Sequence, residues 1–296
     1  MNITELSTGH VPGSSAQVQP RIRLPGGSCD SHLHVFGDAN RYPMDTRRNY
    51  TPAGATLAQY RAVMAACGIE RAVLVQPSVY GTDNRCLLDA LREAAQEGGA
   101  AFRGIVVPDA KSSDSDLEAM HVLGVRGIRL NLVNPQMLDV DAALAMAARM
   151  KQRGWHLQLH VSVQESGEAQ LAALAQRADG LGIAIVVDHM GRPAPGTISR
   201  LLIDLLADGR VWVKLSAPYR NSHAPAPAHA DLLPLVRALV GANPDQLLWG
   251  SDWPHTELST AAPRVADLVD LLATWVPDES IRHRICVANP ARVYDF

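Results

Sequence analysis

The chain has 296 residues, of which 47% are apolar, 19% are charged and 5% are aromatic. This composition supplies a large aliphatic core and excludes an intrinsically disordered chain. The 27 basic and 30 acidic residues give a net charge of -3, so no bulk field favours binding to nucleic acid. No run approaches the ~20 consecutive apolar residues that cross a bilayer. Four scattered cysteines without a C-x-x-C pair are typical of a reducing compartment, and we expect a cytoplasmic protein.

Residues 1–27 are polar and lack the basic and apolar segments of a signal peptide, so we interpret them as an N-terminal arm. Residues 28–296 form one predicted domain, in which apolar runs rich in β-branched residues alternate with amphipathic helical patterns. The predicted strands are 29–36, 71–76, 102–107, 125–131, 155–161, 183–189, 211–216 and 247–252. The clearest helical segments are 55–67, 83–97, 140–153, 166–178 and 230–241.

Eight strand–helix units of this length predict an α/β fold, a TIM-type (β/α)8 barrel, which typically has about 250 residues. The alternative is a doubly wound open sheet. That fold would usually place a glycine-rich phosphate turn after its first strand, and no such turn follows Phe36-Gly37. The sequence therefore favours a single barrel domain with a short N-terminal arm.

Polar residues recur at the carboxyl ends of the predicted strands. His32 and His34 lie two apart in the first strand and so share one face. His160, His189 and Asp252 end the fifth, sixth and eighth strands, where the active sites of such barrels are built. A lone H-x-H or strand-end histidine is more often structural, but burying all five together without a ligand would be costly. Neutral imidazoles with a carboxylate suit zinc or a similar divalent ion.

Three arginines follow strands at the same predicted mouth: Arg129, Arg192 and Arg220. A guanidinium matches both oxygens of a carboxylate, so these arginines are the donors that an anionic small-molecule substrate would need; the alternative for each arginine is a structural ion pair. His255 lies on the loop beyond Asp252, as a partner of the site or a donor to the substrate. Alternation along the sixth strand points Asp188 away from the lumen, so we leave it out of the site.

Five motifs in chain order carry a resemblance to the amidohydrolase superfamily, and within it to the branch of lactone hydrolases acting on 2-pyrone-4,6-dicarboxylate, sulfomuconolactone and sugar lactones. The motifs are Asp30-Ser31-His32-Leu33-His34-Val35-Phe36-Gly37, Gln76-Pro77-Ser78 with Gly81-Thr82-Asp83-Asn84, Arg126-Gly127-Ile128-Arg129, Asp188-His189-Met190-Gly191-Arg192-Pro193 and Trp249-Gly250-Ser251-Asp252-Trp253-Pro254-His255.

The resemblance implies hydrolytic opening of a carboxylated lactone by an activated water. One divalent metal, zinc by its ligands, would be held by the set His32, His34, His160 and Asp252. Asp252 would also be the acid/base, and His189 would polarise the carbonyl. Ser78 and Tyr50 would contact the substrate through their hydroxyls. The resemblance also implies that the protein forms a homodimer.

This sequence differs from the pyrone-dicarboxylate lactonases in two respects that affect the expected metal and substrate. Those enzymes work without metal and have a tyrosine where this chain has His160. Their Lys-Arg grip on a substrate carboxylate is replaced here by Asn134-Pro135. Both differences favour a metal-dependent relative with a somewhat different lactone, and the lack of a strand-four lysine disfavours a carbamate-bridged pair of metals.

Several alternatives stay open on the sequence. A metal-free mechanism would use Asp252 as base and the histidines as electrophiles. A related enzyme could be a non-oxidative decarboxylase of an aromatic or muconate acid, or a lactone isomerase. The alternative that is not an enzyme is a ligand-binding barrel that has lost catalysis. The presence of all five polar site residues argues against this alternative.

Overall fold

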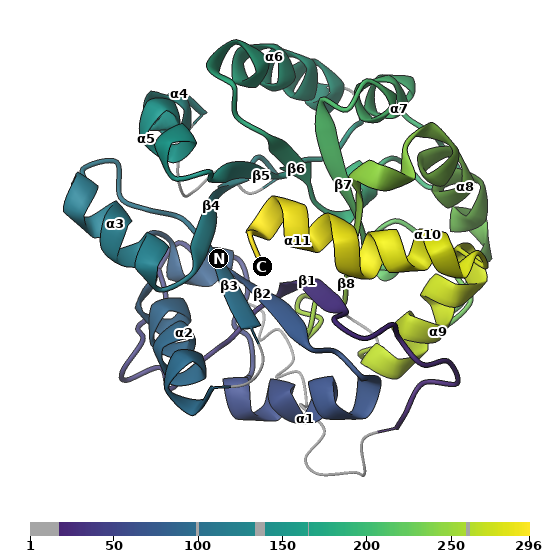
Figure 1. Ribbon diagram of the computed structural model, residues 1–296, viewed down its shortest axis with the longest axis horizontal. Coiled ribbons are helices and arrows are strands. Elements are labelled where there is room, and N and C mark those ends of the chain that lie inside the picture. Colours follow the sequence, from purple (N-terminus) through teal and green to yellow (C-terminus); the bar gives the residue numbers. More distant parts are fainter. Residues whose placement is uncertain (1–17, 99–100, 134–139, 165, 259–260) are drawn as a thin grey trace, which may run out of the picture.

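The computed structural model describes residues 18–98, 101–133, 140–164, 166–258 and 261–296. Eight parallel strands follow one another in chain order around one sheet (Figure 1). They are β1 (Cys29–Leu33), β2 (Arg71–Val75), β3 (Ala101–Val106), β4 (Val125–Asn131), β5 (His156–His160), β6 (Ile185–Val187), β7 (Val211–Ser216) and β8 (Leu247–Gly250).

Backbone hydrogen bonds from the residues after β8 complete the circle. The N–H of Asp252 donates to the carbonyl of His32 at 2.8 Å, and the N–H of His34 donates to the carbonyl of Trp253 at 2.8 Å. The predicted single (β/α)8 barrel is therefore confirmed. These same two bonds bring the end of the eighth strand directly beside the two histidines of the first.

Three strands end two or three residues earlier than predicted, at Leu33, Val187 and Gly250. The backbone beyond two of them turns left-handed, with φ of 53° at His189 and 60° at Asp252. A left-handed residue cannot continue a strand, because β geometry requires a strongly negative φ. The polar residues of these ends therefore stand on turns at the mouth of the barrel.

The helices surround the strands, and Figure 1 shows α1 to α9 on the outside with α11 lying across one end of the barrel. They are α1 (Leu57–Cys67), α2 (Arg85–Glu97), α3 (Asp114–Val122), α4 (Val140–Ala145), α5 (Ala147–Gln152), α6 (Ser166–Leu181), α7 (Arg200–Ala207), α8 (Leu233–Ala242), α9 (Val265–Trp275), α10 (Glu279–His283) and α11 (Asn289–Tyr294). The predicted helix 140–153 is thus two short helices, and α3 was not among the segments that the pattern singled out.

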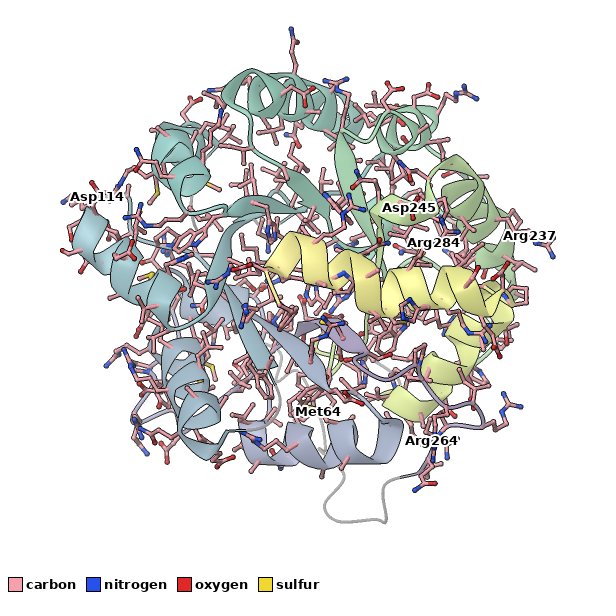
Figure 2. All side chains as sticks on the ribbon, in the orientation of Figure 1. Met64, Asp114, Arg237, Asp245, Arg264 and Arg284 are labelled. Atoms are coloured by element: carbon pink, nitrogen blue, oxygen red, sulfur yellow. The ribbon has the colours of Figure 1, made fainter. Side chains whose placement is uncertain are left out.

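The first helix shows how local sequence sets these bounds. The Thr56 hydroxyl accepts from the N–H of Gln59, and the Gln59 side chain accepts from the N–H of Thr56 at 2.8 Å, which forms a capping box. The helix ends at Gly68, whose φ of 71° suits a residue without a Cβ. Between these caps, Leu57 and Met64 are buried, and Figure 2 labels Met64 on this helix.

One buried cluster draws on six of the strands together with α11, and it comprises Cys29, Val73, Val75, Ile105, Val186, Trp212, Leu248 and Tyr294. Residues from six strands can meet in this way only inside the barrel. Tyr294 comes from α11 and is fully buried. Because α11 lies across the end of the barrel opposite the mouth (Figure 1), this helix closes the interior there. The polar centre described below therefore stands on an apolar base.

The outer surface carries ion pairs such as Arg284 with Asp245 at 3.0 Å, both labelled in Figure 2. Exposed pairs of this kind add little stability. Of the predicted arm, only residues 18–27 are described; the Arg21 guanidinium donates to Asp270 of α9 at 2.9 Å. The division at residue 27 stays a prediction. Among the described helices, none combines the length and the apolarity that crossing a membrane requires.

Candidate active site

His32 of β1 and His34, which follows the strand directly, are oriented by their Nδ1 atoms. The His34 Nδ1 donates to the carbonyl of Val75 at 2.7 Å, which leaves Nε2 with its lone pair. The His32 Nδ1 lies 3.2 Å from Asp188 Oδ1, its shortest contact, and donates to that carboxylate. Burial lowers the pKa of His32 to about 4, so its imidazole is neutral at physiological pH. The His32 ring thus presents an unprotonated Nε2 to the mouth, and the Nε2 of His34 lies beside it.

Asp252 is the carboxylate that these rings face. Its Oδ1 lies 3.6 Å from His32 Nε2, 3.5 Å from His34 Nε2 and 3.9 Å from the Nε2 of a third ring, His189. Its Oδ2 accepts from Tyr219 Oη at 2.7 Å and from Arg220 Nε at 3.2 Å. The two carboxylate oxygens therefore have different surroundings: Oδ2 accepts hydrogen bonds, whereas Oδ1 faces the three imidazole rings.

The charge state of Asp252 follows from the same neighbours. Burial alone would raise the pKa of its carboxyl, but the positive charge of the Arg220 guanidinium holds the pKa well below the ordinary value. Asp252 is thus an anion across the physiological range. A buried anion beside neutral imidazoles is the electrostatic setting of a metal site or of a general base.

The turn after β6 corrects one expectation. Asp188 does not point away from the lumen: it is fully buried and touches His32, Gln158 and Lys214. Val186 of β6 already belongs to the interior cluster, so alternation places Asp188 inward as well. His189 follows it inward because its left-handed backbone breaks the alternation. The His189 Nδ1 lies 2.8 Å from the Ser216 hydroxyl of β7.

Beneath the imidazoles lies a buried lysine. Lys214 of β7 has no exposed surface; its ammonium donates to Gln158 Oε1 at 2.7 Å and to the carbonyl of Ser31 at 2.8 Å, and lies 3.4 Å from Asp188 Oδ1. Burial lowers the pKa of Lys214 to about 8, against the opposing charge of Asp188. The ammonium and Asp188 together form a fully buried ion pair next to His32.

Among the residues that the structure describes, two groups of potential metal ligands have donor atoms within 4.8 Å of one another: His32, His34 and Asp252 form one, and His32, Asp188 and His189 form the other. His160, predicted as a further ligand, belongs to neither group. Its Nε2 accepts from Arg192 Nη1 at 3.2 Å, and its ring centroid lies 5.2 Å from that of His189. The structure thus brings His160 to the mouth but beside an arginine, and its role as a ligand stays a prediction.

The three predicted arginines have distinct surroundings. Arg129 is buried and donates from Nη1 to the carbonyl of Gln76 at 2.8 Å, so it is partly committed to the barrel. Arg220 holds Asp252 and donates to the carbonyl of Thr256 at 3.0 Å. Arg192 contacts His160, and burial together with the charge of Arg220 lowers its pKa. Asn134 and Pro135, which replace the family's Lys-Arg grip, lie outside the described residues.

The remaining predicted contacts also lie at the mouth. Burial raises the pKa of Tyr50 to about 12, the charge of Glu257 adds to this, and the Ser78 hydroxyl opposes it, so Tyr50 and Ser78 lie together. His255 is buried with its Nδ1 3.2 Å from Tyr219 Oη, and burial lowers its pKa to about 4. Its Nε2 is buried without a hydrogen-bond partner among the described residues.

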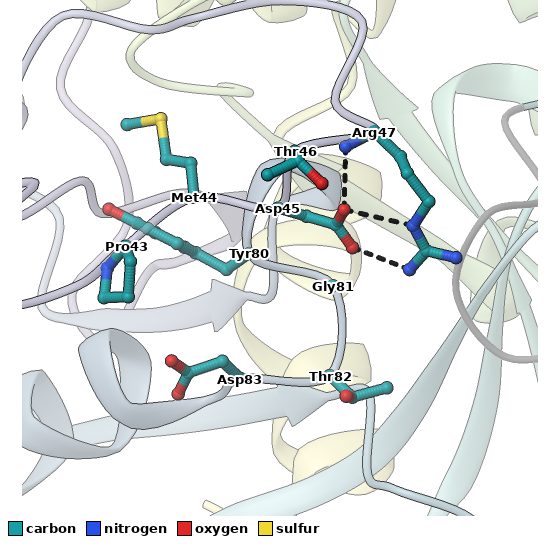
Figure 3. A pocket seen from close by; sticks show the side chains of 9 residues that line it. All are labelled: Pro43, Met44, Asp45, Thr46, Arg47, Tyr80, Gly81, Thr82 and Asp83. Atoms are coloured by element: carbon teal, nitrogen blue, oxygen red, sulfur yellow. Dashed lines mark hydrogen bonds and ion pairs between the residues drawn. The ribbon is translucent and has the colours of Figure 1, made fainter.

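A surface hollow of about 360 Å³ lies between residues 43–47 and 80–83 (Figure 3). Figure 3 shows the Asp45 carboxylate turned towards Arg47, whose Nη2 donates to it at 2.7 Å. The other acid of the hollow, Asp83, is paired with Arg85. None of the histidines of the candidate site lines this hollow, and its carboxylates are already engaged, so it is not the reactive centre.

Four residues that contact the centre were not predicted: Gln158, Lys214, Ser216 and Tyr219. The signal for Lys214 was present in the sequence, since a lysine inside the apolar run VWVKLS shares the inward parity of Trp212. Such a lysine is either buried and paired or incompatible with a central strand. Tyr219 lies on a short turn after β7, where no periodic pattern indicates the direction of its side chain.

Comparison with known proteins extends this description over most of the chain. The profile of the amidohydrolase family matches residues 29–296. A 2-pyrone-4,6-dicarboxylate hydrolase from Comamonas testosteroni is 34% identical over 292 residues, covering 93% of this chain and 92% of that protein. A 4-sulfomuconolactone hydrolase from Rhizobium radiobacter is 35% identical over 282 residues, covering 92% and 91% of the two chains.

Solved structures show the same architecture. One from Pseudomonas putida, which carries the provisional name 2-pyrone-4,6-dicarboxylic acid hydrolase, superposes with a TM-score of 0.76 at 30% identity. The superposition covers 92% of this chain and 98% of that one. The similarity therefore spans the whole barrel, including every strand end that contributes to the site.

Proposed function

Because the chain belongs to the amidohydrolase family, we propose that it is a hydrolase that opens the ring ester of a carboxylated lactone. The observation that carries this proposal is the convergence of three imidazole Nε2 atoms on Asp252 Oδ1, at 3.5 to 3.9 Å, at the mouth of a closed barrel. The names of the two curated relatives support a lactone bearing one or more acidic groups.

The residues present fit one divalent ion at His32, His34 and Asp252. The His32 Nε2 is buried with no partner among the described residues, which is costly unless a ligand satisfies it. Two ligands of a tetrahedral zinc ion lie about 3.3 Å apart, close to the 3.5 and 3.6 Å that separate Asp252 Oδ1 from the two rings. Such an ion would supply a Lewis acid and lower the pKa of water towards ~7. His160 stays our predicted additional ligand.

Asp252 serves as the proton carrier in this proposal. Its Oδ1 accepts a proton from the attacking water, and its low pKa keeps it ready to do so at neutral pH. The Tyr219 hydroxyl and Arg220 hold Oδ2, so the carboxylate keeps its orientation as its charge changes. Asp252 then returns the proton to the departing ring oxygen, which completes the ester cleavage with one carboxylate.

His189 polarises the carbonyl of the lactone. The Ser216 hydroxyl, 2.8 Å from Nδ1, donates to that nitrogen and leaves the proton of the neutral ring on Nε2. Burial keeps the pKa of His189 well below its ordinary value, so the ring acts as a neutral donor to the developing oxyanion. Its position beside Asp252 places carbonyl and water on adjacent sides of the carboxylate.

Arg192 and Arg220 orient the substrate through its carboxylate. Burial and the charge of Arg220 lower the pKa of Arg192, and an anion between the two guanidinium groups would relieve their repulsion. Ser78, Tyr50 and His255 provide further hydroxyl and imidazole contacts around the ring. Arg129 contributes positive electrostatic potential to the site without contacting the substrate, because its guanidinium is anchored by a hydrogen bond to the carbonyl of Gln76.

The test is a comparison of substrates on purified, metal-supplemented protein: 2-pyrone-4,6-dicarboxylate, 4-sulfomuconolactone, muconolactone and a neutral aldonolactone. We expect ring opening with release of one proton for at least one carboxylated lactone. Asp252→Asn should abolish it, and Asp245→Asn, an exposed acid on the outer surface, is the matched control. Absence of opening for all four substrates would refute the proposal.

The same assay separates the alternative reactions. Release of carbon dioxide would identify a decarboxylase, and an isomeric lactone without uptake of labelled oxygen from water would identify an isomerase. Metal analysis after chelation separates the metal-dependent reaction from the variant in which Asp252 is the only base. Full activity of protein without bound metal would remove the ion from the mechanism.

We propose a cytoplasmic enzyme whose partner is a small anionic lactone, without nucleic acid or membrane. The net charge of -3 and the absence of a spanning helix among the described residues support this setting. A homodimer stays a prediction, and light scattering on the purified protein measures it.

A further inference from the structure

The two groups of potential ligands share His32 and therefore define two adjacent positions for a cation. The first, among His32, His34 and Asp252, opens to the mouth. The second, among His32, Asp188 and His189, lies deeper in the barrel. A centre with this many ligand atoms could in principle load two ions, so what occupies the deeper position decides its stoichiometry.

The deeper position already has a cation beside its ligand atoms. Lys214 Nζ lies 3.4 Å from both Asp188 Oδ1 and His32 Nδ1. A lysine ammonium has three donors, and here they meet Ser31, Gln158 and Asp188. The Lys214 side chain has no exposed surface, and all three of its donors are engaged. The position of its positive charge is therefore fixed.

Asp188 is correspondingly engaged at both oxygens. Oδ1 accepts from His32 Nδ1 at 3.2 Å and faces the ammonium, while Oδ2 accepts from Gln158 Nε2 at 3.1 Å and lies 3.9 Å from Arg129 Nε. A metal ion at this carboxylate would have to displace these donors. It would also face two like charges in a dry interior, where repulsion is poorly screened.

The outer position differs in this respect. The cation near Asp252 is Arg220, whose Nε contacts Oδ2 rather than the Oδ1 that faces the imidazoles. The His34 Nδ1 is bound to a neutral carbonyl, that of Val75. The lone pairs of the outer position are therefore free of an adjacent ammonium.

We propose that the Lys214 ammonium is the resident cation of the deeper position, so that this centre takes a single divalent ion at His32, His34 and Asp252. The inference rests on the metal centre of the proposed function and adds to it a residue that sets the stoichiometry. Lys214 is a positioning residue here: it holds Asp188, which in turn fixes the Nδ1 proton of His32 and leaves Nε2 for the outer ion.

Equilibrium dialysis against Zn²⁺ or Co²⁺, followed by elemental analysis in the presence of a weak competing chelator, counts the tightly bound ions. We expect one equivalent for the wild-type chain and for Lys214→Arg, which keeps the charge. Lys214→Gln, which removes it and keeps a polar side chain, should gain a second equivalent. Adding Asp188→Asn to Lys214→Gln should return the count to one, because the deeper carboxylate is then lost.

The wild-type count needs no variant: two tight equivalents, or none, would overturn the inference. If Lys214→Gln fails to fold by circular dichroism, Lys214→Met provides the same loss of charge. A folded charge-free variant that still binds one ion would also overturn it. These outcomes are separate from catalysis, since a chain with one ion that opens no lactone refutes only the proposed activity, and an active lactonase whose Lys214→Gln gains no ion refutes only the inference.

Discussion

The buried pair of Asp188 and Lys214 makes a quantitative prediction about stability. Neither side chain has exposed surface, and their charged atoms lie 3.4 Å apart. Asp188→Asn keeps the shape and removes the anion, whereas Lys214→Met removes the cation and keeps the length. Each single change leaves one buried charge without its nearest counter-ion, and breaking a buried pair in this way typically costs about 3–5 kcal/mol.

The double variant removes both charges and should recover part of that loss. Groups in direct contact usually couple by about 0.5–3 kcal/mol, and we expect the upper part of this range here because both are fully buried. Recovery is incomplete, since Asp188 also accepts from His32 and Gln158, and these donors lose a charged acceptor in the double variant.

Urea unfolding at neutral pH, followed by circular dichroism for the wild type, both single variants and the double variant, measures the four free energies of unfolding. Arg284→Met, which breaks an exposed pair with Asp245, is the matched control and should change the free energy by less than about 1 kcal/mol. Strictly additive losses in the cycle, or single variants as stable as the control, would show that the two charges do not depend on each other.

Three further predictions concern activity and titration. Asp252→Asn should lower kcat by about 10²–10⁴-fold with the fold intact, as loss of an acid/base group does, and a rate near that of the wild type would exclude Asp252 as proton carrier. Arg192→Met should raise KM for a carboxylated lactone by about 10–100-fold through loss of a charge-assisted hydrogen bond, with kcat nearly unchanged; an equal effect on a neutral lactone would contradict this role. Burial raises the pKa of the Cys67 thiol from 9.0 to about 11, so its labelling by a disulfide reagent should be slow at pH 8 and accelerate towards pH 11. Because this pKa is higher in the folded state, the stability that the neutral thiol contributes is present below pH 9 and decreases as the pH rises to 11. If Cys67 in the native protein were labelled at pH 8 as fast as in urea-unfolded protein, the raised pKa would be contradicted.

Much of the fold followed from the sequence because its signals are local and repeated. Each strand run is apolar and β-branched, and the order of eight such runs leaves few topologies. The convergence of His32, His34, His189 and Asp252 was predictable for the same reason, since the carboxyl ends of neighbouring parallel strands must meet at one edge. The Nε2 atom of each of the three rings indeed lies within 3.9 Å of Asp252 Oδ1.

The details that sequence reasoning missed depend on single backbone angles and on distant partners. Strict alternation cannot place Asp188 and His189 on the same side, and only the left-handed turn at His189 allows it. The surroundings of His160 depend on Arg192, which follows a different strand and whose Nη1 lies 3.2 Å from His160 Nε2. Lys214 was visible as an anomaly within an apolar run, but its counter-charge lies 26 residues earlier in the chain and only the closed barrel brings the two together.

The tyrosine at the base of the barrel links the completion of folding to the chemistry at the opposite end. Tyr294 belongs to α11, which comes after all eight strands in the chain, and its ring lies 5.9 Å from the ammonium of Lys214 and 5.3 Å from the ring of His156. With α11 in place, its buried tyrosine separates the inner charges from solvent at this end of the barrel. The imidazoles at the mouth thus depend for their low-dielectric surroundings on a residue contributed by the final segment of the polypeptide.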